Sequence, residues 1–514
     1  MDQSKAEAKR PPYGIIAVLM IGAFIAFLNN TLLNIALPSI MKDLEIEAST
    51  VQWLTTGFML VNGILIPLSA FLIQKFSVRQ LFLAAMILFT VGTVLAGFAH
   101  AFPLLLTGRM TQAAGSAIMM PLLMNVMLTS FPVEKRGMAM GVFGLVLMFA
   151  PAIGPTLSGW IIEHYDWRML FHFITPIAIV VVLIGFFLLK DKKGKVDIKL
   201  DFLSVILSSI GFGGLLYGFS SAGKDGWDSP KVYGTLAIGV IALVTFILRN
   251  LNQERPLLNF RIYKYPMFAL SSAISMVVTM AMFSGMLLLP IYVQTIRGIS
   301  PIDAGLLLLP GAIVMAIMMP ITGKLFDKFG GRLLAILGLS ITVITSYLLS
   351  NLTLDMSYKH LIFLYTLRMF GMSMVNMPVT TNGLNQLPAR FYPHGTAMNN
   401  TMQQVSGAIG TALLVTVMTT RAKTHATELV AAAKAKMLSN PPTTAITEAM
   451  KLKMQHDIQM KAMLEGINDA FYVSVFIAGL ALVLAFFIKR AKQAEDPGEA
   501  KPAGNKVTAK LAEN

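Results

Sequence analysis

The sequence predicts an all-α polytopic membrane protein with fourteen transmembrane helices and both termini in the cytoplasm. Three observations lead to this prediction. Of 514 residues, 55% are hydrophobic and only 13% are charged, too few charges to cover a soluble protein of this size. The apolar residues gather in runs long enough to cross a bilayer. The basic residues gather in alternate gaps between these runs.

The apolar runs are continuous and do not alternate with period two, which favours helices over the strands of a barrel. No cleavable signal peptide is evident, because the first run is longer than the apolar region of such a signal. The runs lie near residues 13–37, 51–73, 80–100, 103–130, 138–161, 170–189, 202–221, 232–248, 267–292, 303–323, 333–351, 360–384, 395–419 and 468–488.

Charge gives the orientation. Of the 41 Lys and Arg residues, 26 lie in the N-terminal segment, the even-numbered gaps and the C-terminal tail, against 6 in the six short odd-numbered gaps. The positive-inside rule therefore puts both termini in the cytoplasm. The net charge of +15 comes from these short loops and not from a polar basic domain, so we expect no nucleic-acid partner.

Parts of the sequence recur in its two halves. The tenth gap contains Gly323, Asp327, Gly330 and Arg332. The second gap has the same spacing and repeats its Leu, Lys, Phe and Arg, but not its Asp or its glycines. Arg-Met pairs at 109–110 and 368–369 are each followed by small residues and Met. A weak duplication of parallel halves is typical of transporters.

The motifs resemble those of the major facilitator superfamily. The tenth gap matches its G-x-x-x-D-[RK]-x-G-x-[RK] loop motif, and Arg109, Gln112 and Gly115 resemble its fourth-helix motif. The fifth run resembles its antiporter motif, with Ala150 and Ser158 in place of glycines. The antiporter-motif residues that we single out are Gly141, Gly154, Pro155 and Gly159.

The first run ends N-N-T-L-L-N-I-A-L-P, which is similar to a signature of the 14-helix drug:proton antiporters. Within that branch the chain is most similar to lincomycin-resistance-type exporters. The resemblance implies the major facilitator fold, in which two six-helix bundles rock around a central cavity. The implied divisions are a cytoplasmic N-terminus 1–12, a bundle 13–189, a linker with a two-helix insert 190–248, a bundle 249–488 with a long extracellular loop 420–467, and a cytoplasmic tail 489–514.

The implied function is secondary active efflux of small amphipathic or antibiotic substrates, by alternating access and proton-coupled antiport, across a bacterial cytoplasmic membrane. The alternative is an exporter of an endogenous lipid, peptide or siderophore with uncertain proton coupling. An enzyme is not expected, because the seven His are scattered and show no metal-ligand spacing. We expect no cofactor and no metal, with protons and membrane lipids as further partners. The oligomeric state stays open, and a monomer is compatible.

Arg109 is the main candidate for proton coupling, because a guanidinium inside a span costs at least about 2.5–3.5 kcal/mol and needs partners. Gln112 lies one turn away on the same helix face. The other interpretation is a structural donor to carbonyl groups or a side chain that reaches the membrane surface. The same alternatives are open for Arg368, which lies nearer the outer end of its run.

The first run departs from the family, which has Asp where this chain has Asn29. Amides do not titrate, and no acid lies deep in any run, so the expected proton-carrying group is missing. Asn29, Asn30 and Asn34 can instead bind substrate or join helices. The substrate-cavity candidates are therefore Asn29, Asn30, Asn34, Asn376, Asn382 and Gln403.

Small residues at 150, 154 and 158 form a stripe along one face of the fifth run, which permits close packing with another helix. Asp327 is expected either to cap the N-terminus of a neighbouring helix or to pair with an Arg, and so to latch the cytoplasmic side. In the first half, Gln74 and Ser77 replace the Asp and Gly of that motif, which leaves only neutral hydrogen bonds. Both segments that flank Pro441-Pro442 in the loop 420–467 are expected to be helical.

Overall fold

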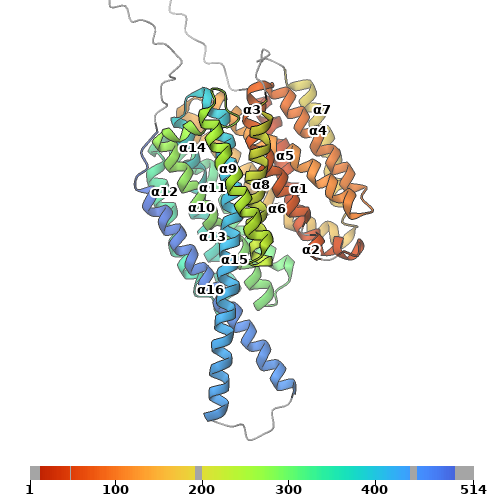
Figure 1. Cartoon of the computed structure of the whole chain (residues 1–514), viewed down its shortest axis with the longest axis vertical. Coiled ribbons are helices and arrows are strands. Elements are labelled where there is room, and N and C mark those ends of the chain that lie inside the picture. Colours follow the sequence, from red (N-terminus) through yellow and green to blue (C-terminus); the bar gives the residue numbers. More distant parts are fainter. Residues whose placement is uncertain (1–11, 47, 52, 191–199, 440–447, 492–514) are drawn as a thin grey trace, which may run out of the picture.

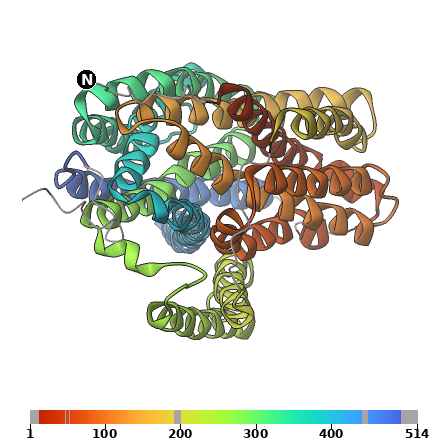
Figure 2. The ribbon, with the colours of Figure 1, turned by 90° about the horizontal axis from the view of Figure 1, so that it is seen from above.

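The computed structural model describes residues 12–46, 48–51, 53–190, 200–439 and 448–491. All regular elements within these ranges are helices. Figure 1 shows them as one long bundle, and Figure 2 shows the bundle along its axis.

The first half of the bundle begins at Tyr13 and ends at Leu188. Its helices cross the bundle up and down, as short connections between long apolar segments require. They are α1 (Tyr13–Asp43), α2 (Ala48–Val51), α3 (Trp53–Lys75), α4 (Val78–Gly97), α5 (Phe102–Ser130), η1 (Val133–Lys135), α6 (Arg136–His164) and α7 (Met169–Leu188).

Two helices, α8 (Phe202–Asp225) and α9 (Pro230–Asn252), form the insert between the halves. Figure 2 shows the pair on the outside of the bundle. The two helices approach closely at Gly214, where an added Cβ would lie 2.9 Å from the Cα of Gly239. Helix α8 packs against α3 of the first half and against α15 of the second. The insert therefore lies where the two halves meet.

The second half contains a matching set of helices and two that are much longer. They are η2 (Phe260–Lys264), α10 (Pro266–Ile291), a π-helical turn η3 (Tyr292–Ile296), α11 (Pro301–Phe329), α12 (Gly331–Leu349), α13 (Tyr358–Ser373), α14 (Asn376–Gln386), η4 (Ala389–Phe391), α15 (Tyr392–Ser439) and α16 (Glu448–Ala485).

Every one of the fourteen expected runs is helical, but thirteen helices in the described ranges are long and apolar enough to cross a membrane. The run 360–384 differs, because it divides into α13 and α14. Met374 and Val375 form a tight turn between them, with hydrogen bonds to carbonyls three residues earlier. Pro378 follows in α14 and has no N–H to continue the α13 ladder. The expected span is thus an interrupted helix.

Both described ends of the chain lie at the same end of the bundle. Tyr13 packs edge-to-face on Phe131, and the carbonyl of Phe131 accepts a hydrogen bond from Arg136. The residue after Arg136 binds Asp327, and Arg490 donates to the backbone oxygen of Asp327. The charge distribution assigns this end to the cytoplasm.

The outer end carries a helical hairpin in place of an irregular loop. Helix α15 has 48 residues and α16 has 38, so α15 is about 70 Å long at 1.5 Å per residue, against roughly 30 Å of hydrocarbon. Figure 1 shows both helices projecting beyond the bundle. Asp469 joins them, because it binds both Arg421 and His425. The expected helices of 420–467 are present, while Pro441-Pro442 lies outside the described residues.

Asp201 joins the two helices of the insert. Its carboxylate accepts from the N–H and hydroxyl of Ser204 at the start of α8, and from Arg249 and Gln253 on or just after α9. Burial opposes ionisation of this carboxyl group, but the hydrogen bonds from Arg249, Ser204 and Gln253 outweigh it and hold the pKa of Asp201 well below its usual range. A lowered carboxyl pKa stabilises the fold above its unfolded-state pKa of about 3.9 and loses this effect only in stronger acid.

We predict that Asp201→Asn lowers the unfolding temperature of the purified protein by several degrees at pH 7, because it removes charge-assisted hydrogen bonds that contribute about 1.5–3 kcal/mol each. Scanning fluorimetry in detergent measures this. Asp228→Asn is the matched control, since Asp228 is exposed at the other end of the same helix pair. Equal unfolding temperatures for the two variants would contradict the role of Asp201.

Candidate functional site

Close packing of α4 and α5 brings polar residues together inside the first half. An added Cβ at Gly108 would lie 2.8 Å from the backbone oxygen of Gly92. One at Gly115 would overlap the carbonyl of Ala85. Because glycines permit this approach, Gln112 on α5 reaches Thr93 on α4, whose hydroxyl accepts its amide hydrogen at 2.8 Å.

Arg109 is fully buried in the same region. Its Nη1 donates to Oδ1 of Asn29 at 3.1 Å and to Oε1 of Gln112 at 2.9 Å. Its Nη2 donates to Oδ1 of Asn30 at 2.9 Å. The guanidinium carbon lies 4.4 Å from the centre of the Phe58 ring, a cation–π arrangement. Arg109 therefore ties α5 to α1 and α3, and it does not reach a membrane surface.

No carboxylate balances this charge among the described residues. The partners of Arg109 are amide oxygens and an aromatic face, and its Nε is buried without a hydrogen bond. In the described part of the chain, the buried charged side chains include Arg109, Arg136 and Arg368 but no Asp, Glu or Lys. A buried charge is costly unless polar groups compensate it. Here neutral amides supply that compensation.

Arg368 forms a similar centre in the second half. It is fully buried, and it donates from Nη1 to Ser346 on α12 and from Nη2 to Ser284 on α10, at 3.0 and 2.8 Å. The hydroxyl of Ser284 in turn contacts Ser474 on α16. The idea that Arg368 reaches the outer membrane surface is therefore wrong. Its position in an interrupted helix, surrounded by three others, was not visible in the sequence.

The small-residue stripe of α6 packs against α1. The Thr31 hydroxyl donates to the carbonyl of Ala150, and an added Cβ at Gly154 would overlap this hydroxyl. Further along, the Ser158 hydroxyl donates to the carbonyl of Leu32 at 2.7 Å. Gly159 is half-buried, and the side chain of Pro155 is outside the described set. The stripe holds α1 and α6 in close contact, as expected.

A different part of α6 packs against α11 of the other half. An added Cβ at Gly141 would overlap the carbonyl of Met319 and lie 2.9 Å from the Cα of Pro320. Nearer the cytoplasm, one at Gly323 would overlap the carbonyl of Gly137. Glycines from both motifs therefore permit backbone contact between the halves.

Asp327 fastens this contact at its cytoplasmic end. Its two carboxylate oxygens accept from the backbone N–H groups of Gly137 and Met138, at 2.8 and 2.9 Å. The side chain thus caps the N-terminus of α6, the first of its two expected arrangements. Gly330 ends α11 with φ of +81°, a conformation that favours glycine. Arg332 is exposed and does not take part.

Two further contacts join the halves nearby. Arg136 on α6 donates from Nη1 to Asn385 at 3.2 Å and to the hydroxyl of Tyr392 at 2.8 Å. The amide nitrogen of Gln74 lies 3.1 Å from Nε2 of His394. All hydrogen bonds observed between described residues of the two six-helix halves lie at this cytoplasmic end. The structure is therefore closed on the cytoplasmic side.

The remaining amide candidates do not join the Arg109 centre. The side chain of Asn382 is hydrogen-bonded to the backbone that follows α16: it donates to the carbonyl of Lys489 and accepts from the N–H of Ala491. Asn376 and Gln403 are half-buried on α14 and α15. Asn34 belongs to α1, but its side chain lies outside the described ones. Of the six substrate-cavity candidates, Asn29 and Asn30 thus form a cluster with Arg109.

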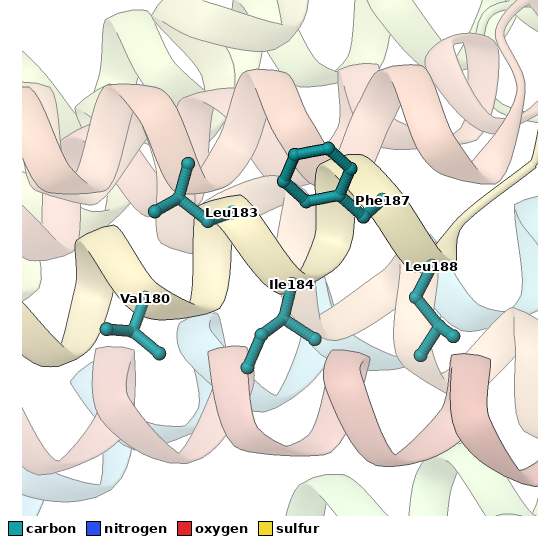
Figure 3. A pocket seen from close by; sticks show the side chains of 5 residues that line it. All are labelled: Val180, Leu183, Ile184, Phe187 and Leu188. Atoms are coloured by element: carbon teal, nitrogen blue, oxygen red, sulfur yellow. The ribbon is translucent and has the colours of Figure 1, made fainter.

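An apolar hollow of about 420 Å³ lies on the outer surface of α7. Figure 3 shows its lining side chains, which all come from this helix. Phe187 is 77% exposed, so the hollow faces the acyl chains of the membrane and is separate from the Arg109 centre. Its lining residues are Val180, Leu183, Ile184, Phe187 and Leu188.

Comparison with known proteins agrees with this architecture. The family model described as Major Facilitator Superfamily matches residues 19–411. The chain belongs to this superfamily. It is 47% identical to an uncharacterized MFS-type transporter, YhcA, of Bacillus subtilis, over 96% of each chain. It is 41% identical to the lincomycin resistance protein LmrB of Bacillus subtilis, over 95% of this chain and 98% of that protein.

A solved structure, that of the human organic anion transporter MFSD10, matches with a TM-score of 0.63 at 13% identity, over 93% of this chain and 100% of the other. At that identity the match concerns the fold. The superfamily and its relatives identify the chain as a multi-pass transporter of the bacterial plasma membrane, in the drug:proton antiporter branch, and a member of a transporter family and not of an enzyme family.

We predict that Gly141→Ala weakens closure of the cytoplasmic side, because the new methyl group would overlap the α11 backbone. The expected result is a lower unfolding temperature and at least a tenfold loss of transport rate. Gly479→Ala is the control, since an added Cβ there meets nothing within 4 Å. If Gly141→Ala transports at the rate of the control, the contact does not matter.

Proposed function

We propose that this transporter is a secondary active exporter of small amphipathic compounds, antibiotics among them. It works by alternating access and exchanges its substrate for protons. The observation that carries the proposal is the pairing of a closed cytoplasmic end with a buried guanidinium at Arg109 that is held by neutral amides and by no carboxylate of the described residues. The relatives named for lincomycin resistance support the substrate class.

Alternating access requires contacts that close one side and can be broken. The cytoplasmic contacts are of this kind, because the helix cap at Asp327 and the hydrogen bonds of Arg136 and Gln74 each contribute only about 1–3 kcal/mol. Their loss would let the halves separate at this end and open the opposite way, the rocking that transporters of this architecture use. The close glycine contacts at Gly141 and Gly323 then set the closed position.

Arg109 supports coupling through its neutral surroundings. Three amide oxygens bind the guanidinium, and each could be exchanged for a substrate oxygen or a water at small electrostatic cost, which a carboxylate partner would not allow. Because Asn29 and Asn30 lie on α1 and Arg109 lies on α5, any such exchange changes how these helices are tied. We infer that substrate competes for these contacts during transport.

We predict that Arg109→Ala abolishes efflux and that Arg109→Lys reduces it at least tenfold. A lysine carries the charge but cannot reproduce the planar set of donors. The measurement is lincomycin efflux from cells that lack other exporters, with surface expression checked for each variant. Lys359→Ala, an exposed base at the outer end of the bundle, is the control. Full efflux by the Arg109→Ala variant would refute the assigned role.

The energy source is tested in proteoliposomes. We predict that an imposed pH gradient drives accumulation of lincomycin, and that a protonophore which collapses the gradient stops it. Substrate movement should also release protons on the opposite side, seen with a trapped pH dye. Accumulation that continues at full rate after the gradient is removed would contradict proton exchange while leaving the transporter assignment intact.

A further inference from the structure

The contacts that close the cytoplasmic side include an imidazole. His394 lies in the first turn of α15 and is 6% exposed. It touches both the first half, through Gln74 at the end of α3, and the segment before η2, through Asn259. No local sequence pattern marks this histidine, because its two partners are 320 and 135 residues away in the chain.

The ring contacts one backbone hydrogen-bond donor and one side-chain amide. The backbone N–H of Asn259 donates to Nδ1 at 3.3 Å. The side-chain amide of Gln74 faces Nε2, with its nitrogen 3.1 Å from that atom, and the same nitrogen donates to the carbonyl of Ala70 at 3.1 Å. Because a backbone N–H cannot be inverted, the contact at Asn259 requires Nδ1 to be unprotonated.

This arrangement accepts a neutral ring and rejects a charged one. A neutral imidazole has one nitrogen that accepts a hydrogen bond, whereas an imidazolium has none and carries N–H groups at both positions. Protonation of His394 would therefore set its new N–H against that of Asn259. The closed contact cannot survive protonation in the same geometry.

The surroundings offer no compensation for an imidazolium. The neighbouring elements carry Lys75 on α3, Arg136 on α6 and Arg390 on η4, and α15 begins at Tyr392. The ring also lies at a helix N-terminus, where a positive charge is unfavourable. The segment η2 contributes further bases and a phenol: Arg261, Tyr263 and Lys264.

The carboxylates at this end include Asp327 on α11, Glu134 on η1, Asp201 before α8 and Glu254 after α9. None of them forms an ion pair or hydrogen bond with the ring in the described part of the chain, and Asp201 is paired with Arg249. Asp327 is already occupied by the two N–H groups of α6. A proton on His394 would thus be a buried charge with no counter-ion.

We propose that His394 is a proton-binding residue of the cytoplasmic gate, and that protonation of its imidazole separates α15 from α3 and holds the protein open to the cytoplasm. This inference deepens the proposed alternating access and rests on it. The direction follows from linkage. The closed state binds fewer protons at His394 than the open, hydrated state, so closure is favoured above about pH 6.5, the ordinary titration point of histidine, and is lost as the pH falls below it.

The experiment measures the distance between the two halves at their cytoplasmic end, in the absence of substrate. The chain has no cysteine, so Lys135→Cys and Ala389→Cys introduce one spin label on each half, at exposed positions of η1 and η4 on the cytoplasmic side. Electron–electron double resonance in nanodiscs then gives the distance distribution from pH 8.0 to pH 5.5. We expect the long-distance, open population to rise at least fivefold toward pH 5.5.

Two variants in the labelled background locate the proton. His394→Asn keeps a neutral amide at this position, and we expect its open population to change less than twofold over the same pH range. His360→Asn, which removes an exposed histidine at the outer start of α13, should respond like the parent. A parent distribution that does not change with pH, or a His394→Asn response equal to that of the parent, overturns the proposal.

The outcome is separable from the proposed export function. Efflux of lincomycin together with a pH-independent gate would overturn this inference alone. A pH-dependent gate that needs His394, in a protein that exports no tested compound, would support the inference and contradict the proposed substrate class. Gln74→Ala gives a second check: removal of the first-half partner should raise the open population at pH 8.0 while the response to acid remains.

Discussion

The structure depends on holding the buried guanidinium of Arg109 without an opposite charge. Three amide oxygens and the face of Phe58 do this, and they come from α1, α3 and α5. The close packing of glycines between α4 and α5 is what brings Gln112 and Thr93 into the set. The same solution, a guanidinium among hydroxyl groups, recurs at Arg368 in the second half. Each half is thus organised around an internal cation with neutral partners.

The hydrogen bonds between the two halves are distributed differently from those inside each half. Inside each half, contacts are dense and many hydrogen bonds are buried, whereas between the halves the hydrogen bonds cluster at the cytoplasmic end. A contact limited to one end permits rotation about it. The insert α8 spans the junction from the side, since it touches both α3 and α15. From this position, α8 can stay in contact with both halves as they rotate.

The sequence predicted the helices well, because membrane spans are set by local hydropathy, and it predicted the burial of Arg109 because a charge inside a span must find partners nearby. The environment of a side chain could not be predicted where it depends on residues far away in the chain. Arg368 is enclosed by α10, α12 and α16, and no local pattern indicates that enclosure. Asn382 was expected in a cavity and instead holds the chain after α16. No local pattern marks His394, because its neighbours Gln74 and Asn259 belong to other segments of the chain.

Helix α15 has a mechanical consequence. It runs from Tyr392 to Ser439, from the cytoplasmic contact of His394 to the outer hairpin, and its one proline, Pro393, lies in the first turn. A straight helix of about 70 Å behaves as a lever arm, so that a tilt of roughly 10° about one end displaces the other by about 12 Å. Asp469 ties α16 to this arm through Arg421 and His425. A tilt of α15 at the cytoplasmic contact would therefore move the hairpin on the cell exterior by a much larger distance.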